Sequence, residues 1–201
     1  MNFVVFAMPR TKSTWLSRFL SYGQTVCGHD EATKWRNMDD IKSWFSMPNS
    51  GLVDTTIYPF WRSVGEFAPN AKVVVLRRPI DEVIESTKRW GVNLPDAYYT
   101  SALTKIDAKL RQIAFRLPNV LEITFAELCT EEGCRKVWDH CMTVPWDQVW
   151  YDILKNQNIQ PEWNRVRQYY TAHRPQIEKL AATMRRHTIN KLQFKGSRTL
   201  E

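Results

Sequence analysis

The chain has 201 residues, of which 43% are hydrophobic and 24% are charged, a composition that favours one folded core and excludes a disordered chain. No stretch approaches the roughly 20 apolar residues that span a bilayer, and we expect no signal peptide, so a membrane protein is excluded as well. The four cysteines form no Cys-x-x-Cys pair, which argues against a zinc site and favours reduced thiols in a cytoplasmic protein.

The net charge of +7 is concentrated toward the C-terminus. From Pro161 onward nine basic residues stand against three acidic ones, so this segment carries +6 and the rest of the chain carries +1. Such a segment suits a polyanionic ligand or nucleic acid. A solvated helix face explains the same composition, and the sequence leaves both interpretations open.

The first predicted element is a short buried strand over Asn2–Met8, where four apolar residues follow one another. A polar turn occupies residues 9–14. Apolar side chains then recur at helical spacing up to Gly23, so we expect a helix that begins near Ser13. Backbone N–H groups at the start of such a helix point into the turn, which suits a bound phosphate.

The same pattern of strand, turn and helix returns at Lys72–Arg77, a second apolar strand. Pro79 then opens a helix with Asp81 and Glu82 in its first turn, where the helix dipole favours acidic residues. Further strands are predicted at Gly51–Asp54 and Val120–Thr124, and further helices at Pro59–Phe67 and Pro95–Leu117.

Alternating strands and helices, with unbroken apolar strands, predict an α/β fold in which helices cover both faces of a parallel sheet. Beyond Phe125 the pattern is largely helical to about Arg186, which adds a helical C-terminal part. No repeat or Gly/Ser linker divides the chain, so we expect a single domain over residues 1–201. Residues 195–201 are expected to fray, and we interpret the final Leu200-Glu201 as vector-derived.

Parallel sheets bind ligands at the carboxyl ends of their strands, so the turn at residues 9–14 is the first candidate site. It is not a Walker loop of the kind that binds nucleoside triphosphates with Mg²⁺. That pattern requires glycine at two positions ahead of Lys-Ser/Thr, and counting back from Lys12-Ser13 places Phe6 and Thr11 there. The missing glycines disfavour an ATPase, and we expect no metal ion at this site.

The segment Pro9–Leu16 resembles the 5′-phosphosulfate loop of sulfotransferases that use 3′-phosphoadenosine-5′-phosphosulfate, commonly Pro-Lys/Arg-Ser-Gly-Thr-Thr-Trp-Leu. The resemblance implies a P-loop-like sulfotransferase architecture, with Arg10 at the leaving phosphate and Trp15 near the adenine. Lys12 departs from the family, which usually has glycine there, and a side chain at that position needs room and a tolerable backbone angle. The donor-binding residues that the resemblance implies in this loop are Arg10, Thr11, Lys12, Ser13, Thr14 and Trp15.

The segment Val73–Ser86 resembles the 3′-phosphate site of the same family, which consists of a strand, then Arg-x-Pro, then a helix that carries a serine about two turns on. The resemblance implies that Arg77 binds the 3′-phosphate, with Arg78 as a second candidate. Ser86 lies nine residues after Arg77, whereas the more familiar spacing is eight. One residue turns a helical side chain by about 100°, so the spacing leaves the role of Ser86 open.

Sulfuryl transfer needs a cation at the leaving phosphate, which is the role expected of Arg10, and a base that takes the acceptor's proton. The segment 28–31 follows the first helix and is expected to return toward the donor site. Because some sulfotransferases that act on glycans place a catalytic Glu in a comparable region, Glu31 is the first candidate base. His29 is the second, because its ordinary pKa suits the task, and Asp54, at the end of a strand, is the third.

We therefore expect a sulfotransferase that moves a sulfuryl group from 3′-phosphoadenosine-5′-phosphosulfate to an acceptor hydroxyl or amine on a small molecule or glycan. One alternative is a metal-dependent P-loop phosphotransferase, which the missing glycines disfavour. The other is a nucleic-acid-binding protein that uses the basic segment after Pro161. Binding of 3′-phosphoadenosine 5′-phosphate without Mg²⁺ separates the first hypothesis from the other two. The acceptor and the oligomeric state have no signature in the sequence.

Overall fold

One parallel sheet organises the chain, in a computed structural model that describes residues 2–92 and 94–159. Its five strands lie in the order β2-β3-β1-β4-β5, and every neighbouring pair is parallel. The strands are β1 (Phe3–Ala7), β2 (Val26–His29), β3 (Ser50–Asp54), β4 (Lys72–Arg77) and β5 (Val120–Thr124). Because all five run in one direction, the loops that follow them emerge at a single edge of the sheet.

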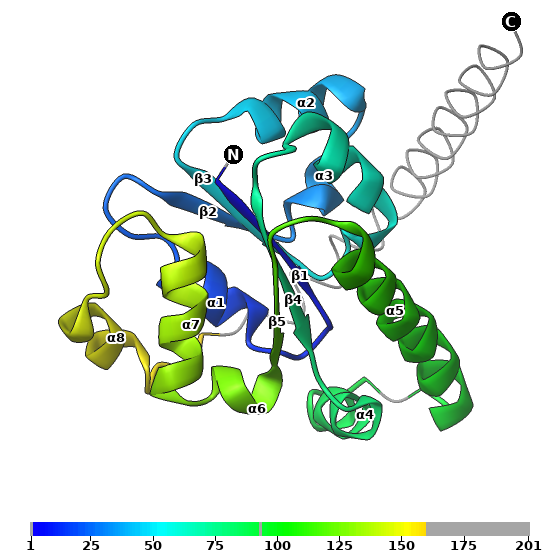
Figure 1. Cartoon of the computed structure of the whole chain (residues 1–201). Coiled ribbons are helices and arrows are strands. Elements are labelled where there is room, and N and C mark those ends of the chain that lie inside the picture. Colours follow the sequence, from blue (N-terminus) through cyan, green and yellow to red (C-terminus); the bar gives the residue numbers. More distant parts are fainter. Residues whose placement is uncertain (1, 93, 160–201) are drawn as a thin grey trace, which may run out of the picture.

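Helices lie on both faces of this sheet, as the sequence predicts (Figure 1). One face packs against α2 (Met38–Ser46), α3 (Trp61–Phe67), α4 (Ile80–Arg89) and α5 (Asp96–Arg116). The other packs against α1 (Ser13–Phe19), α6 (Phe125–Leu128), α7 (Glu131–Cys141) and α8 (Gln148–Leu154). Short 3₁₀ turns cover Glu31–Lys34 and Tyr58–Phe60. The predicted α/β architecture, a parallel sheet between two layers of helices, is confirmed.

The central position of β1 in the sheet explains why its residues form an unbroken apolar run. Side chains alternate between the two faces of a strand. Val4 and Phe6 therefore enter the core beneath α2, α3 and α5, whereas Phe3 and Val5 enter the core beneath α1 and α7. A central strand that is buried on both faces has no position left for a polar side chain, so the run in the sequence follows from the layered fold.

Two elements escaped the sequence analysis, and both lie at the β2 edge of the sheet. The edge strand β2 has only β3 as a neighbour, and its sequence of Val, Cys, Gly and His lacks an apolar run. Gly28 is required there, because a Cβ atom would lie 2.5 Å from Cγ of Glu31 and 2.6 Å from Cζ2 of Trp44. The helix α2 begins after Asn37, whose side chain accepts hydrogen bonds from the N–H groups of Asp39 and Asp40.

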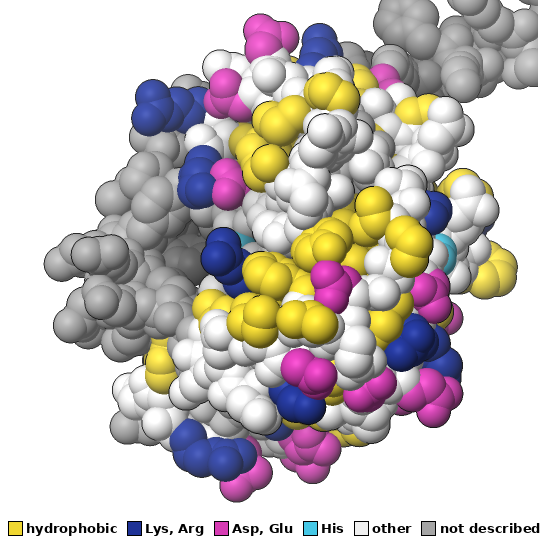
Figure 2. All heavy atoms as spheres, turned by 90° about the vertical axis from the view of Figure 1, so that its left-hand side faces the viewer, with side chains coloured by type: hydrophobic (Ala, Val, Ile, Leu, Met, Phe, Trp, Pro, Cys, Tyr) yellow, Lys and Arg dark blue, Asp and Glu magenta, His cyan; other side chains and the backbone are white. Residues whose placement is uncertain are grey.

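The described helices include none that is long and apolar enough to cross a membrane. Hydrophobic side chains gather on the side of the molecule that carries α7 and α8, among charged groups of both signs (Figure 2). The exposed apolar residues of this region include Val144, Val149 and Ile153. The predicted continuation of the helical part to Arg186, the basic segment from Pro161 and the fraying of residues 195–201 lie outside the described residues.

Candidate functional site

The loop after β1 begins between the two central strands. The N–H of Met8 donates to the carbonyl of Leu76 at 2.9 Å, so the loop leaves the sheet beside the end of β4. Thr11 is fully buried, and its hydroxyl donates to the carbonyl of Met8 at 2.6 Å. The hydroxyl of Thr11 therefore stabilises the loop from the protein interior. The resemblance had implied that Thr11 binds the donor, whereas in the structure its hydroxyl has a structural role.

Two residues of this loop adopt the left-handed backbone conformation that favours glycine. Arg10 has φ of 63° and Lys12 has φ of 58°. For a residue with a Cβ atom this conformation costs about 1–2 kcal/mol. Lys12 stands where the resembled family has glycine, so the loop keeps the conformation of a glycine while carrying a cationic, exposed side chain. Strain of this kind persists only where surrounding contacts impose it.

Arg10 contacts both Arg78 and Ser86 at the carboxyl ends of β1 and β4. Nη1 of Arg78 donates to the carbonyl oxygen of Arg10 at 2.6 Å. Nε of Arg10 donates to the hydroxyl of Ser86 at 3.3 Å. Burial, followed by the nearby charge of Arg78, lowers the pKa of Arg10, although a guanidinium stays charged at neutral pH. Two neighbouring cations of this kind favour an anion between them.

Arg77, the predicted 3′-phosphate ligand, points to another part of the molecule. Its guanidinium forms a two-pronged ion pair with Asp107 of α5, at 2.7 Å and 3.1 Å, and Arg111 pairs with the same carboxylate at 2.9 Å. Consecutive residues at the end of a strand face opposite sides, so Arg77 and Arg78 diverge. Ser86 follows Arg78 by eight residues, which is the spacing that the resemblance called for.

Trp15 belongs to the core rather than to the loop surface. Its side chain is only 4% exposed, and its ring stacks on Phe19 with 5.0 Å between the ring centroids. The indole N–H donates to the carbonyl of Leu154 at 2.8 Å, which joins α1 to α8. The expectation that Trp15 lies beside an adenine therefore does not match its position, because the inner face of α1 is covered by α7 and α8.

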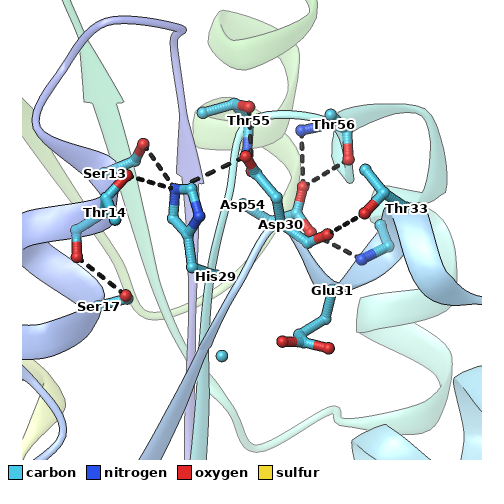
Figure 3. Close-up of polar contacts among 12 residues, drawn as sticks. Ser13, Thr14, Ser17, His29, Asp30, Glu31, Thr33, Asp54, Thr55 and Thr56 are labelled. Atoms are coloured by element: carbon cyan, nitrogen blue, oxygen red, sulfur yellow. Dashed lines mark hydrogen bonds and ion pairs between the residues drawn. The ribbon is translucent and has the colours of Figure 1, made fainter. Parts of the chain in front are cut away.

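His29 lies against the first turn of α1. The hydroxyl oxygens of Ser13 and Thr14 are 3.0 Å and 3.3 Å from its Nε2 atom (Figure 3). Oδ2 of Asp30 lies 3.6 Å from the same nitrogen. Burial lowers the pKa of His29, so the imidazole is neutral at pH 7 and able to take up a proton.

Two buried carboxyl groups hold the loops around His29 in a reciprocal arrangement. Asp30, at the end of β2, accepts hydrogen bonds from the N–H and the hydroxyl of Thr55, in the loop after β3. Asp54, at the end of β3, accepts one from the N–H of Ala32, in the loop after β2, and two from Thr56 (Figure 3). Each carboxyl group therefore fixes the loop that follows the neighbouring strand.

Burial raises the pKa of Asp54 to about 7, and the nearby charge of Asp30 adds to the increase. Burial also raises the pKa of Asp30. Both oxygens of Asp54 accept hydrogen bonds from the protein, and the side chain has almost no exposed surface. Asp54 is therefore enclosed as a structural group, which leaves it no path to an acceptor molecule.

Glu31 lies on the opposite side of β2 from the loop. Its carboxylate pairs with Lys34 at 2.6 Å and points away from Ser13 and Thr14 (Figure 3). Its Cγ atom lies where a side chain at Gly28 would stand, on the face that α2 covers. Of the three candidate bases, His29 is the one that contacts the loop after β1. The sequence analysis assigned no strand to Val26–His29, so the alternation of side chains along β2 could not be used to choose among the three candidates.

The sequence matches no family model and no curated protein. Among solved structures, the chain is similar to a sulfotransferase from Alicyclobacillus acidocaldarius, with a TM-score of 0.49 and 14% sequence identity over 92% of this chain and 95% of that chain. The function proposed below rests on the residues of this chain.

The chemistry available at the edge of the sheet follows from these contacts. Arg10 and Arg78 supply positive charge, Ser86 supplies a hydroxyl, and the neutral His29 supplies a proton acceptor within reach of two further hydroxyls. Among residues 2–92 and 94–159, no group of three His, Cys, Asp or Glu side chains is placed to hold a metal ion. The described site is thus suited to binding an anion and removing a proton nearby.

Proposed function

We propose that this protein is a sulfotransferase that moves a sulfuryl group from 3′-phosphoadenosine-5′-phosphosulfate to a hydroxyl or amine of a small molecule or glycan. The observation that carries the proposal is the contact of Arg10 with both Arg78 and Ser86 at the ends of β1 and β4. A donor with a 5′-phosphosulfate and a 3′-phosphate needs two cationic positions at one edge of the sheet. Guanidinium groups suit both, because they bind phosphate oxygens in pairs.

The donor supplies the sulfuryl group, and the chain's residues supply its binding site. Arg10 neutralises the charge that develops on the 5′-phosphate, and Arg78 with Ser86 binds the 3′-phosphate. The residues that would hold the donor are Arg10, Lys12, Ser13, Thr14, Arg78 and Ser86. Thr11 supports these residues, because its hydroxyl donates to the carbonyl of Met8 and so holds the loop in place. Stabilising charge that develops during transfer is the contribution that lowers the barrier most.

His29 is the base in this proposal. The acceptor oxygen or nitrogen forms a bond to sulfur while the bond between sulfur and the 5′-phosphate oxygen breaks, and the acceptor's proton passes to the imidazole. The lowered pKa of His29 keeps the ring unprotonated before transfer. The carboxylate of Asp30, 3.6 Å from Nε2, then stabilises the imidazolium that forms. Glu31 has no such contact with the loop.

The decisive experiment is ligand binding without a metal. The product 3′-phosphoadenosine 5′-phosphate should raise the melting temperature, since a ligand that binds only the folded state stabilises it by about 2.7 kcal/mol at 100 times its Kd. Addition of EDTA should change nothing. AMP, which lacks the 3′-phosphate, should stabilise the protein less. Equal stabilisation by AMP, or a requirement for Mg²⁺, would contradict the proposal. Transfer of labelled sulfate from the donor to a panel of acceptors then identifies the acceptor.

A further inference from the structure

The side chains of His29 and Asp30 meet at the end of β2, although the two residues are neighbours in the chain. Neighbouring side chains of an extended strand point to opposite faces. The strand ends at His29, and Asp30 adopts the left-handed conformation, with φ of 50° and ψ of 37°. Oδ2 of Asp30 then lies 3.6 Å from Nε2 of His29 (Figure 3). Such a backbone conformation persists only where neighbouring contacts impose it.

Thr55, in the loop after β3, supplies the contacts that hold the side chain of Asp30. Its N–H donates to Oδ1 of Asp30 at 2.8 Å, and its hydroxyl donates to the same oxygen at 3.0 Å. Two donors from one residue fix the position of Oδ1. Because both oxygens of a carboxylate are bonded to one planar carbon, fixing Oδ1 also fixes the direction of Oδ2, which faces the imidazole of His29.

The same two hydrogen bonds favour the charged form of Asp30. Burial raises the pKa of this carboxyl group, whereas the N–H and the hydroxyl of Thr55 lower it. A hydrogen bond to a carboxylate stabilises the ionised form over the acid. Thr55 therefore both directs the carboxylate of Asp30 and supports its negative charge.

Asp54 differs from Asp30, although it joins the same two loops. Its Oδ1 accepts hydrogen bonds from Thr56 and from the N–H of Ile57, and its Oδ2 accepts one from the N–H of Ala32. Both of its oxygens are thus directed to the loops. Of the two buried carboxyl groups, Asp30 is the one that places an oxygen beside the imidazole.

Other groups act on the imidazole besides Asp30. Burial lowers the pKa of His29, the nearby charges of Asp54 and Glu31 raise it, and the charge of Lys34 lowers it. The first turn of α1 contributes two hydroxyl groups, which carry no charge. A proton added to the ring is therefore stabilised by carboxylates, and Oδ2 of Asp30 lies within 3.6 Å of Nε2.

We infer that Thr55 is a positioning residue of the transfer reaction, because it holds the carboxylate of Asp30 with one oxygen facing Nε2 of His29, where that oxygen stabilises the imidazolium. Thr55 acts through Asp30 and touches neither the donor nor the acceptor. The inference rests on the function proposed above for the reaction that His29 serves, whereas the contacts of the three residues are independent of that function. The loop after β3 thereby becomes part of the reaction centre.

The first test follows the imidazole by NMR and needs no ligand. The signal of His29 is assigned by its absence in His29→Gln, and its pKa is measured by pH titration. Thr55→Val removes the hydroxyl and keeps the N–H, so it should lower the pKa of His29. Asp30→Asn should lower it further, because a nearby negative charge favours the imidazolium. Thr55→Ser keeps the hydroxyl and should leave the pKa of His29 as it is in the unmodified protein.

Thr33→Val is the matched control for this titration. The hydroxyl of Thr33 donates to the backbone carbonyl of Asp30 at 2.6 Å and not to its carboxylate. Thr33→Val therefore removes a hydrogen bond to the same residue and should leave the pKa of His29 unchanged. An unchanged pKa in Thr55→Val or in Asp30→Asn, or the same decrease in Thr33→Val, would overturn the inference.

The second test measures steady-state rates of sulfuryl transfer. Thr55→Val should lower kcat by about 2- to 10-fold, the effect of losing one hydrogen bond, while KM for the donor stays within about twofold. Thr33→Val should keep kcat within about twofold. A raised KM with kcat unchanged in Thr55→Val would place Thr55 at donor binding and so contradict the inference. Because the titration needs no ligand, absence of transfer by the unmodified protein would count against the proposed function alone.

Discussion

Where β1 and β4 end, the edge of the sheet carries the guanidinium groups of Arg10 and Arg78, whereas the ends of β2 and β3 carry the carboxyl groups of Asp30 and Asp54. The two cations rest on aromatic rings and a hydroxyl. The two carboxyl groups are enclosed by the N–H groups of neighbouring loops. One half of the edge is therefore arranged to receive an anion, and the other half fixes its own loops. His29 lies on the acidic half and contacts the first turn of α1.

Backbone strain in charged residues occurs on both halves of this edge. Among the described residues, the non-glycine positions with positive φ include Arg10, Lys12 and Asp30 at this edge, and Asn49 and Asn119 just before β3 and β5. Asparagine tolerates the left-handed conformation more easily than longer side chains do. Strain in charged residues therefore concentrates at the carboxyl edge, where it accompanies the candidate site.

Removing the proton acceptor should have the largest effect. We expect His29→Gln to lower turnover by roughly 10²–10⁴, the usual scale for a general base, while bisphosphate affinity stays within about twofold. The rate of the unmodified protein should rise with pH through a pKa below 6.5 and then level off, because only the neutral imidazole accepts a proton. Glu31→Gln is the matched control and should keep near-normal turnover. If Glu31→Gln loses turnover and His29→Gln keeps it, the base is Glu31.

Removing a cation tests the other half of the edge. Arg78→Ala should weaken the bisphosphate by about 10- to 100-fold and AMP much less, since a charge-assisted contact contributes about 1.5–3 kcal/mol. Arg77→Ala is its neighbour in sequence but removes an ion pair with α5 instead. It should leave the affinity for the bisphosphate nearly unchanged, as measured by calorimetry. A selective loss in Arg77→Ala would assign the 3′-phosphate to Arg77 after all.

The buried carboxyl pair should appear in the pH dependence of stability. The pKa of Asp54 is raised from 3.8 to about 7 in the folded protein, so its contribution to stability is complete below about pH 4 and is lost as pH rises through about 7. Asp54→Asn should shrink the change in unfolding free energy between pH 5 and pH 8 by at least half. Urea titrations at both pH values measure this. The same pH dependence in both proteins would show that Asp54 is ionised throughout this range.

The smallest expected effect concerns the strain at Lys12. Lys12→Gly should raise the free energy of unfolding by about 1 kcal/mol, because glycine adopts the left-handed conformation without steric cost. The same change should weaken the bisphosphate modestly, because it removes a positive charge. Lys12→Ala removes the charge but keeps the strain, so it should lose affinity without gaining stability. Equal stability of the glycine and alanine variants would mean that the loop is relaxed.

Much of the site's location could be predicted from local patterns. The apolar runs of β1 and β4 predicted two central strands, and the polar turns after them predicted a site at their carboxyl ends. These patterns can be recognised in the sequence because a strand that is buried on both faces contains only apolar residues. The edge strand β2 has no such run, so neither it nor the face on which His29 lies could be predicted. The position of Trp90 beside Arg10 could not be predicted either, because a tryptophan at the end of a helix has no local sequence signature.

The sequence alone was enough to predict the strands β1, β3, β4 and β5 in their order, a parallel sheet and the two loops that carry arginine. The packing of the folded chain sets which residue of each pair contacts the segment after β1: Arg78 rather than Arg77, and His29 rather than Glu31. Apolar periodicity is a property of neighbours in sequence, so it can be read along the chain. The face that a polar side chain takes at a strand end depends on register and on helices packed from far along the chain, and a shift of one residue reverses it.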